Sequence, residues 1–331
     1  MTKPIVVLTR RLPDEVERAA AEHFDLRRNV DDRPMTVPEM QQALREADGI
    51  VCTLGDPLKE ALKGGPWRTR ILANFGAGTD HIDLETARAL GMIVTDTPGA
   101  LTDATADLAM ALILMATRRL GEGEREVRAG EWSGWRPTHL LGNSLQGKTL
   151  GIIGFGRIGQ ATARRARLGF GMNIIYAGRN EVGVPRRSTT TDTTSLALDA
   201  KAVGLLELLG KSDVISLHTP ATPDTIGMLG AERLRLMKKG SYLINTSRGS
   251  VVDETALIEA LKSGHLAGAG LDVYTREPSI PAELLALKNV VALPHLGSAT
   301  IETRTAMGMR AVVNLGAYFE GRPVLDPVSL G

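Results

Sequence analysis

Short apolar runs alternate with amphipathic segments along most of the chain. Each run is rich in Val, Ile and Leu, and the segments between the runs carry apolar residues at helical spacing. This alternation predicts parallel sheets covered by helices. In the first hundred residues the predicted strands are 5–9, 49–53, 70–74 and 92–95, and the predicted helices are 13–23, 37–47 and 84–90.

The same alternation resumes after residue 149. The predicted strands are 150–153, 173–177, 213–217, 241–245, 267–273 and 289–293, and the predicted helices between them are 202–210, 231–238 and 253–263. Residues 103–119 predict a helix that is too continuously apolar for a surface position. Residues 300–319 predict a final helix with no strand after it, so we expect this helix to return to the first domain.

These elements predict an α/β fold with two Rossmann-like domains that each contain a parallel sheet. We expect a first domain of residues 1–100 plus 299–331, into which a second domain of residues 101–298 is inserted. Residues 119–147 interrupt the alternation and are rich in glycine, charge and tryptophan. Because exposed tryptophans usually contact another surface, we expect a dimer arm here, with an intrachain flap as the alternative.

A glycine-rich turn opens the second domain. The apolar run 150–153 is followed by Gly154, Gly156 and Gly159 and then by a helix-forming segment. This strand-turn-helix context predicts a dinucleotide site, in which the helix N-terminus binds the pyrophosphate. A purely structural glycine-rich turn is the alternative. The cofactor contacts expected from this turn are Gly154, Phe155, Gly156, Arg157, Ile158 and Gly159.

The end of the next predicted strand bears on which cofactor is used. NAD-binding domains usually place an acidic residue there for the ribose hydroxyl, but this chain has Gly178, Arg179 and Asn180. A small residue beside a planar cation suits the 2′-phosphate of NADP. We therefore predict that NADP(H) is preferred and that NAD(H) is the alternative, with Arg179 then an ordinary surface residue.

Composition excludes several classes of function. Lys plus Arg number 39 and Asp plus Glu number 38, so no broad basic field suggests a nucleic acid or an anionic membrane. The apolar part of the N-terminus is too short for a signal peptide, and the apolar run 108–116 is too short to span a bilayer. The single cysteine, Cys52, fits a reducing cytoplasm. No ligand spacing indicates a metal.

Candidate catalytic side chains follow the predicted strands, where parallel sheets present their ligands. His218 and His295 compete on position alone as the proton-transferring histidine. Arg248 is either a clamp for a substrate carboxylate or a surface residue. Glu277 could raise the pKa of a neighbouring histidine, but the sequence does not say which one.

The order and spacing of six segments resemble the D-isomer-specific 2-hydroxyacid dehydrogenase family over essentially the full length. The resemblance is closest to the glyoxylate/hydroxypyruvate reductase branch. The segments are 74–80, 147–154, 245–249, 270–273, 277–278 and 294–298.

The resemblance implies a role for each site residue. His295 would be the general acid/base, Glu277 would keep it protonated, and Arg248 would bind the substrate carboxylate and polarise the carbonyl. Trp135 matches a residue that reaches the neighbouring subunit in family dimers, and the first domain would be flavodoxin-like. The other implied substrate-binding residues are Leu54, Phe75, Gly76, Ala77 and Gly78. The other implied cofactor-binding residues are Thr105, Thr219, Pro220, Thr246, Ser247, Asp272 and Gly297.

The implied activity is the reduction of glyoxylate or hydroxypyruvate to the D-2-hydroxy acid by hydride transfer. Phosphite-oxidising relatives carry a lysine in the 75–78 loop, which this chain lacks, and formate dehydrogenases have Gln in place of Glu277. The segments after Arg179 and Glu277 depart from the family pattern, which leaves their loop geometry open. The alternatives are a reductase of bulkier 2-oxo acids and a non-catalytic, nicotinamide-sensing protein that resembles a corepressor.

Overall fold

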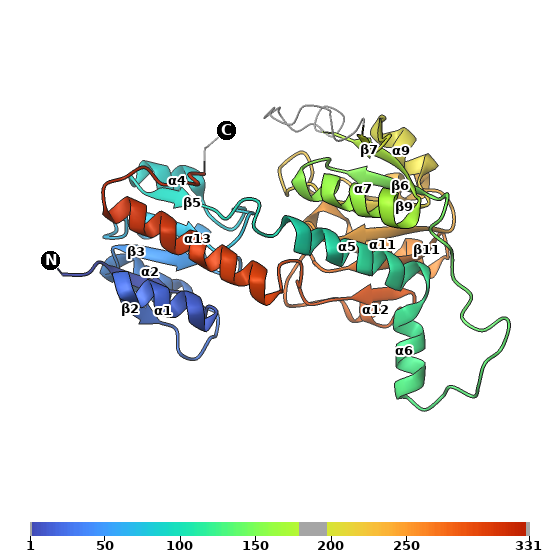
Figure 1. Cartoon of the computed structure of the whole chain (residues 1–331), viewed down its shortest axis with the longest axis horizontal. Coiled ribbons are helices and arrows are strands. Elements are labelled where there is room, and N and C mark those ends of the chain that lie inside the picture. Colours follow the sequence, from blue (N-terminus) through green and yellow to red (C-terminus); the bar gives the residue numbers. More distant parts are fainter. Residues whose placement is uncertain (1, 179–196, 329–331) are drawn as a thin grey trace. The chain divides into compact units, whose positions relative to one another are not determined.

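The computed structural model describes residues 2–178 and 197–328. The chain divides into two compact units, which are Met1–Leu101 with Ser298–Gly331 (unit 1) and Thr102–Gly297 (unit 2). Each unit contains one sheet (Figure 1), and all the paired strands of both sheets are parallel. The two parallel sheets, and the insertion of one unit into the other, confirm the predicted fold class.

Unit 1 has a five-stranded sheet in the order β2-β1-β3-β4-β5. Its buried strands are the apolar runs of the sequence, and helices connect them. The elements are β1 (Ile5–Leu8), α1 (Asp14–His23), β2 (Asp25–Arg28), α2 (Val37–Glu46), β3 (Gly49–Cys52), α3 (Leu58–Ala61), the 3₁₀ turn η1 (Leu62–Gly64), β4 (Ile71–Asn74), α4 (Leu84–Ala89), β5 (Ile93–Thr95) and α13 (Ile301–Phe319).

Alternate residues of each strand in unit 1 face opposite layers of helix. Val6 and Leu8 belong to the core beneath α1 and α13, where Leu315 of α13 is fully buried. Val7 belongs to the other core, beneath α2, α3 and α4, together with Leu44 of α2. The final helix therefore packs on the sheet formed by the first hundred residues.

Unit 2 has a seven-stranded sheet in the order β12-β11-β10-β9-β6-β7-β8. The first strand, β6, lies inside the sheet, and the chain builds outward from it in both directions. The elements are α5 (Thr102–Thr117), α6 (Leu120–Arg128), β6 (Thr149–Ile153), α7 (Arg157–Phe170), β7 (Asn173–Ala177), β8 (Lys201–Ala202), α9 (Leu205–Lys211), β9 (Val214–Leu217), α10 (Ala231–Leu236), β10 (Ser241–Asn245), the 3₁₀ turn η2 (Gly249–Val251), α11 (Glu254–Lys262), β11 (Leu266–Leu271), α12 (Ala282–Leu285) and β12 (Val290–Ala292).

Two layers of helix cover the sheet of unit 2. Ile152 packs with residues of α5 and α7 on one face, and Ile153 packs with residues of α9, α10 and α11 on the other. The strand order reverses between β6 and β9, which is where sheets of this kind bind ligands at their carboxyl ends.

Apart from the 3₁₀ turns and the short helix α12, four elements were not predicted, because their residues lack the expected patterns. β2 is largely polar and exposed, and β8 is an exposed pair of residues that includes Ala202, which was predicted to be helical. α3 is a single short turn. α6 begins the segment that we interpreted as an irregular arm, because its two glycines weaken the helical pattern.

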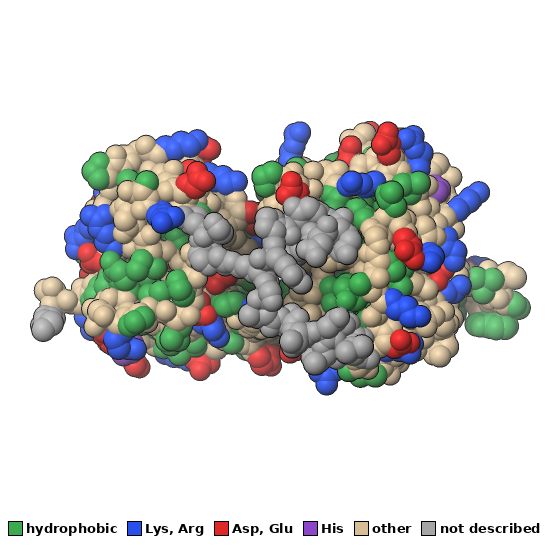
Figure 2. All heavy atoms as spheres, turned by 90° about the horizontal axis from the view of Figure 1, so that it is seen from above, with side chains coloured by type: hydrophobic (Ala, Val, Ile, Leu, Met, Phe, Trp, Pro, Cys, Tyr) green, Lys and Arg blue, Asp and Glu red, His purple; other side chains and the backbone are tan. Residues whose placement is uncertain are grey.

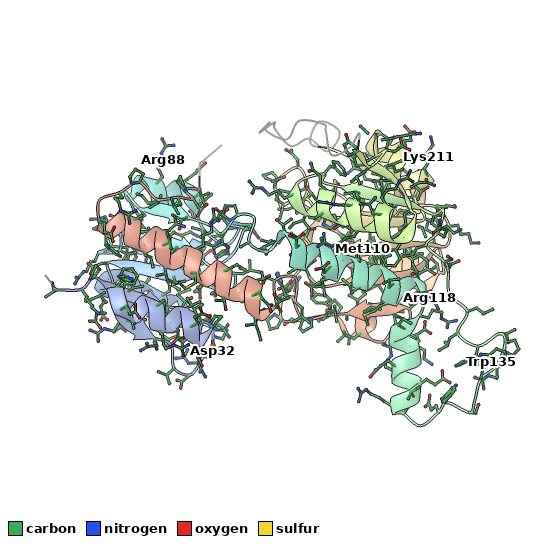
Figure 3. The ribbon with its side chains drawn as sticks, viewed as in Figure 1. Asp32, Arg88, Met110, Arg118, Trp135 and Lys211 are labelled. Carbon is green, nitrogen blue, oxygen red and sulfur yellow. The ribbon has the colours of Figure 1, made fainter. Side chains whose placement is uncertain are left out.

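The segment after α6 lies on the surface of unit 2. Trp132 is 54% exposed and Trp135 is 83% exposed. Figure 3 shows Trp135 on the loop that follows α6, away from the sheet of this unit. The loop is fastened to α6 through His139, whose Nε2 lies 2.9 Å from Glu126 Oε2 and whose Nδ1 lies 2.8 Å from Arg136 Nη2.

Charged side chains of both signs are interspersed on the face shown in Figure 2, in agreement with the balanced composition. Within residues 2–178 and 197–328, no helix is both long enough and apolar enough to cross a membrane.

Candidate functional site

Most of the predicted site residues lie at the carboxyl edge of the sheet in unit 2. The glycine-rich turn follows β6, Gly178 follows β7, and Thr219 and Pro220 follow β9. Thr246, Ser247 and Arg248 follow β10, Asp272 and Glu277 follow β11, and His295 and Gly297 follow β12. Since all the paired strands are parallel, these loops emerge along one edge.

The three glycines of the turn after β6 serve different needs. Gly154 has φ +94°, and a Cβ there would lie 2.6 Å from the carbonyl oxygen of His218. A Cβ at Gly159 would lie 2.3 Å from the carbonyl oxygen of Gly154. No described atom lies within 4 Å of a Cβ position at Gly156. The fold therefore requires glycine at 154 and 159, whereas Gly156 keeps open a space that fits a closely approaching cofactor.

The N-terminus of α7 fits an anion. Gly156 precedes this helix and supplies no side-chain cap, and the first turn of α7 contains no acidic residue. Every other α-helix in the described part of the chain has an acidic residue in its first turn. The positive end of the α7 dipole is therefore left for an external group such as a pyrophosphate.

Further features of this edge also fit a bound dinucleotide. The hydroxyl of Thr246 is buried and makes no hydrogen bond within the described residues. Phe155, inside the glycine-rich turn, stacks on Tyr176 of β7 with ring centroids 3.9 Å apart. The predicted NADP-selecting residues Arg179 and Asn180 lie outside the described residues.

His295 and Glu277 form an acid pair, which the sequence could not assign. The Nδ1 atom of His295 lies 2.7 Å from Oε2 of Glu277, and the two side chains are 32% and 31% exposed. Burial by itself would raise the pKa of Glu277, but the hydrogen bond and charge of His295, the N–H of Tyr274 and the charge of Arg248 together lower it. The pair can therefore hold a proton and present it to a reactant.

His218 occupies a different environment from His295. Its Nε2 lies 2.9 Å from the hydroxyl of Ser216, and desolvation lowers the pKa of His218 to about 4. The ring of His218 is therefore neutral near pH 7 and is unsuited to donating a proton. The structure thus favours His295 between the two histidines that the sequence left in competition.

Hydrogen bonds with residues that follow the neighbouring strand, β11, hold the backbone around His295 in place. His295 has φ +54°, an uncommon conformation for a residue other than glycine. Its N–H donates to the carbonyl oxygen of Asp272, and the Asp272 carboxylate accepts the N–H groups of Leu296 and Gly297 at 2.7 and 2.8 Å. Burial raises the pKa of Asp272. The hydroxyl of Tyr274 donates to the carbonyl oxygen of Leu293 at 2.9 Å.

The other end of this loop is bound by α5. The hydroxyl of Thr105 donates to the carbonyl oxygen of Gly297 at 3.0 Å. The resemblance implied that Thr105, Asp272 and Gly297 line the cofactor. In the structure, these three residues are also joined by hydrogen bonds that hold the loop of His295 in place.

Asn245, the last residue of β10, folds the turn that presents Arg248. Its Oδ1 accepts hydrogen bonds from the N–H and hydroxyl of Ser247, and its Nδ2 donates to the carbonyl oxygen of Arg248 at 2.9 Å. The charge of Arg248 contributes to the lowered pKa of Glu277, so this guanidinium acts on the acid pair. Asn245 was not among the predicted site residues. A buried amide at the end of an apolar strand is the signal that could have identified it.

Unit 1 contains a similar loop after β4. Asn74 is 1% exposed and donates from Nδ2 to the carbonyl oxygens of Gly76 and Gly78 at 3.0 and 2.9 Å. The N–H groups of Ala77 and Gly78 have no acceptor among the described residues. This loop includes Phe75, and Leu54 follows β3 in the same unit.

The described residues contain no cluster of three or more His, Cys, Asp or Glu side chains that could hold a metal ion.

Comparisons with known proteins show the family of this chain. Residues 110–297 match the family described as "D-isomer specific 2-hydroxyacid dehydrogenase, NAD binding domain". A glyoxylate reductase from Thermococcus litoralis is 45% identical over 324 residues, which cover 96% of this chain and 95% of the relative.

Solved structures give the same result. An NADPH-dependent glyoxylate/hydroxypyruvate reductase from Sinorhizobium meliloti, in complex with NADP and malonate, is 35% identical with a TM-score of 0.84, covering 99% of this chain and 97% of that one. The holo D-mandelate dehydrogenase of Rhodotorula graminis is 30% identical with a TM-score of 0.86, covering 100% and 99%. The resemblance seen in the sequence is confirmed, and the chain belongs to the D-isomer specific 2-hydroxyacid dehydrogenase family of nicotinamide-dependent oxidoreductases.

Proposed function

We propose that this enzyme reduces a small 2-oxo acid, glyoxylate or hydroxypyruvate, to the D-2-hydroxy acid, with NADPH as the preferred reductant. The observation that carries the proposal is the acid pair His295–Glu277, which lies at the carboxyl edge of the dinucleotide-binding sheet and is influenced by the charge of Arg248. The relatives named glyoxylate reductase support the choice of substrate.

The glycine-rich turn after β6, the N-terminus of α7 and the hydroxyl of Thr246 would hold the cofactor. When bound, the nicotinamide supplies a hydride for C2 of the substrate. His295 donates a proton from Nε2 to the carbonyl oxygen, because its Nδ1 faces Glu277. The Glu277 carboxylate stabilises the imidazolium before the proton is transferred.

Each unit offers donors that suit the carboxylate of a substrate. The guanidinium of Arg248 can form two parallel hydrogen bonds with a carboxylate and offset charge that develops on the neighbouring carbonyl oxygen. The N–H groups of Ala77 and Gly78 have no acceptor among the described residues, and backbone donors of this kind suit a carboxylate.

The two histidines at the sheet edge provide a direct test of this proposal. His295→Asn should lower kcat for glyoxylate by about 10²–10⁴-fold, the usual contribution of a positioned proton donor. His218→Gln is the matched control and should change kcat by less than about tenfold, because a neutral ring makes no proton transfer here. Circular dichroism melting of both variants checks that they fold. Near-normal turnover by His295→Asn would remove His295 from the mechanism.

A reductase of bulkier 2-oxo acids is the second candidate, because a solved relative is named D-mandelate dehydrogenase. Measuring kcat/KM for glyoxylate, hydroxypyruvate, pyruvate and phenylpyruvate separates the two candidates. We expect the highest kcat/KM values for glyoxylate and hydroxypyruvate. A higher kcat/KM for phenylpyruvate would support the reductase of bulkier 2-oxo acids instead.

The preference for NADPH rests on Gly178 and Arg179 at the end of β7, where the sequence has no carboxylate, and on the relative solved with NADP. We expect kcat/KM with NADPH to exceed that with NADH, and Arg179→Asp to reduce the difference. A strong NADH preference in the wild-type enzyme would contradict this part of the proposal.

We further propose a cytoplasmic homodimer whose arm, residues 119–147, contacts the second copy. The exposure of Trp132 and Trp135 supports a contact that one chain by itself does not supply. Sedimentation should give the mass of two chains, and Trp135→Ala should weaken the association or the reduction of glyoxylate. A monomeric wild-type enzyme with full activity would exclude the dimer.

A further inference from the structure

We propose that Glu254 is a positioning residue for the acid pair, because its carboxylate holds the turn that carries Glu277. This inference rests on the proposed function, in which His295 and Glu277 transfer the proton. Glu254 is the first residue of α11, and no motif or spacing in the sequence assigned it a role in the site.

The turn 274–277 determines where the Glu277 carboxylate lies. Oε1 of Glu277 accepts a hydrogen bond from the N–H of Tyr274 at 3.0 Å, and Oε2 is hydrogen-bonded to Nδ1 of His295. One carboxylate oxygen is thus fixed by the backbone of the turn and the other by the imidazole. A shift of this turn would therefore change the geometry of the acid pair.

The turn rests on the segment that follows Arg248. A Cβ at Gly249 would lie 1.9 Å from the carbonyl carbon of Tyr274 and 2.3 Å from its oxygen, so the two backbones are in direct contact. Oε1 of Glu254 accepts the N–H of Thr275 at 2.7 Å. Contact at Gly249 and a hydrogen bond at Glu254 together join the loop of Arg248 to the turn of Glu277.

The helix itself does not require Glu254 as its cap. Asp253 caps α11 by accepting the N–H of Ala256 at 3.1 Å. Removing the Glu254 carboxylate therefore leaves the cap intact, although it removes one favourable charge from the first turn. Thr275 is exposed, so water can replace the lost hydrogen bond. We expect the turn to loosen without unfolding.

The experiment compares three variants of the full-length enzyme with bound cofactor. Glu254→Ala removes the acceptor for Thr275, whereas Glu254→Gln keeps an amide oxygen that can accept the same N–H. Glu259→Ala is the matched control, because Glu259 lies on the exposed side of the same helix near Lys262. The measurements are kcat, the KM values for glyoxylate and NADPH, the pH–rate profile and the melting temperature.

Glu254→Ala should lower kcat about tenfold, since small displacements of a catalytic group have effects of this order or larger, and should leave KM for NADPH unchanged. The alkaline limb of the pH–rate profile should move to lower pH, because a displaced Glu277 stabilises the protonated imidazole less. Among the described residues, the other titratable or charged groups that act on the pair are Asp272, Tyr274 and Arg248, and all three variants retain them. Glu254→Gln and Glu259→Ala should stay within about twofold of wild type.

Three results would overturn the inference. The first is an unchanged kcat and pH profile in Glu254→Ala, and the second is a change in that variant's melting temperature alone. The third is an equal loss of kcat in Glu254→Gln, which would indicate that the negative charge of Glu254 matters rather than its hydrogen bond. Protonation of the His295 ring, followed by NMR in the same variants, requires no turnover. It therefore tests the positioning even if the wild-type enzyme proves inactive on every 2-oxo acid, a result that would reject the proposed function instead.

Discussion

The loops after β4 in unit 1 and after β10 in unit 2 are built in the same way and differ in how firmly they are held. Each follows a buried parallel strand whose last residue is an asparagine, Asn74 or Asn245. Both asparagines are 1% exposed, and each folds the loop that follows it through its side-chain amide. Each loop offers donors of a kind that suits a carboxylate.

The difference lies in what each loop presents. Asn245 uses both ends of its amide, whereas Oδ1 of Asn74 is buried without a hydrogen-bond partner among the described residues. The loop after β4 offers backbone N–H groups, and the path of the backbone by itself sets where these groups lie. The loop after β10 offers a long, charged side chain, and it is also packed against a second loop at Gly249. A side-chain donor thus requires more support than a backbone donor.

Removing the side-chain donor should have the largest effect. Arg248→Ala should lower kcat/KM for glyoxylate by about 10²–10³-fold, the range seen when one stabilising donor is lost from an active site. Ala77→Gly keeps the backbone N–H in the other loop and should cost less than about tenfold. Steady-state kinetics of both variants test this difference, and equal losses would remove the distinction between the two loops.

Gly249→Ala should have the next largest effect, because the added methyl group would overlap the backbone at Tyr274. We expect a loss of about 3 kcal/mol in the free energy of unfolding, at the upper end for overpacking. Gly76→Ala is the counterpart in unit 1, where the nearest atom would lie at 3.5 Å, and it should cost less than about 1 kcal/mol. Urea unfolding of both variants measures the difference, and similar midpoints would mean that the contact at Gly249 relaxes easily.

The two asparagines should differ by a smaller amount. Asn245→Ala removes the hydrogen bonds of Asn245 with Ser247 and with the carbonyl oxygen of Arg248, and should cost about 2 kcal/mol, mainly through kcat and stability. Asn74→Ala loses two hydrogen bonds but also removes a buried, unpaired oxygen, so about 1 kcal/mol is expected, mainly through KM. If Asn74→Ala proved the more damaging, the proposed order of loop rigidity would be reversed.

The smallest effect concerns pH. The pKa of Glu277 is lowered in the folded protein from an ordinary value of 4.5, so its contribution to stability is complete above that pH and is lost as the pH falls below it. The unfolding free energy of Glu277→Gln should therefore decline less steeply below about pH 4.5 than that of the wild type. The difference should be less than about 1 kcal/mol, because the pair is partly exposed. Parallel slopes for wild type and variant would show that the pair contributes nothing to stability.

Much of the fold could be predicted from sequence because its signals are local. The strand 173–177 was predicted with the boundaries that the structure shows, because an apolar run between turn residues reports burial directly. The polar edge strand β2 was not predicted, because its pairing depends on β1 rather than on its own residues. The glycine-rich turn was predicted from its spacing, and the structure shows that a Cβ at Gly154 or Gly159 would lie too close to neighbouring backbone atoms.

The sequence by itself determined the two parallel sheets, the glycine-rich turn and the set of candidate side chains at strand ends, since periodicity and spacing describe neighbours along the chain. Only the tertiary structure paired His295 with Glu277, left His218 neutral, and revealed the support from Asn245 and Glu254. These relations depend on which strands lie side by side and how the loops between them meet, and no local pattern of residues encodes either.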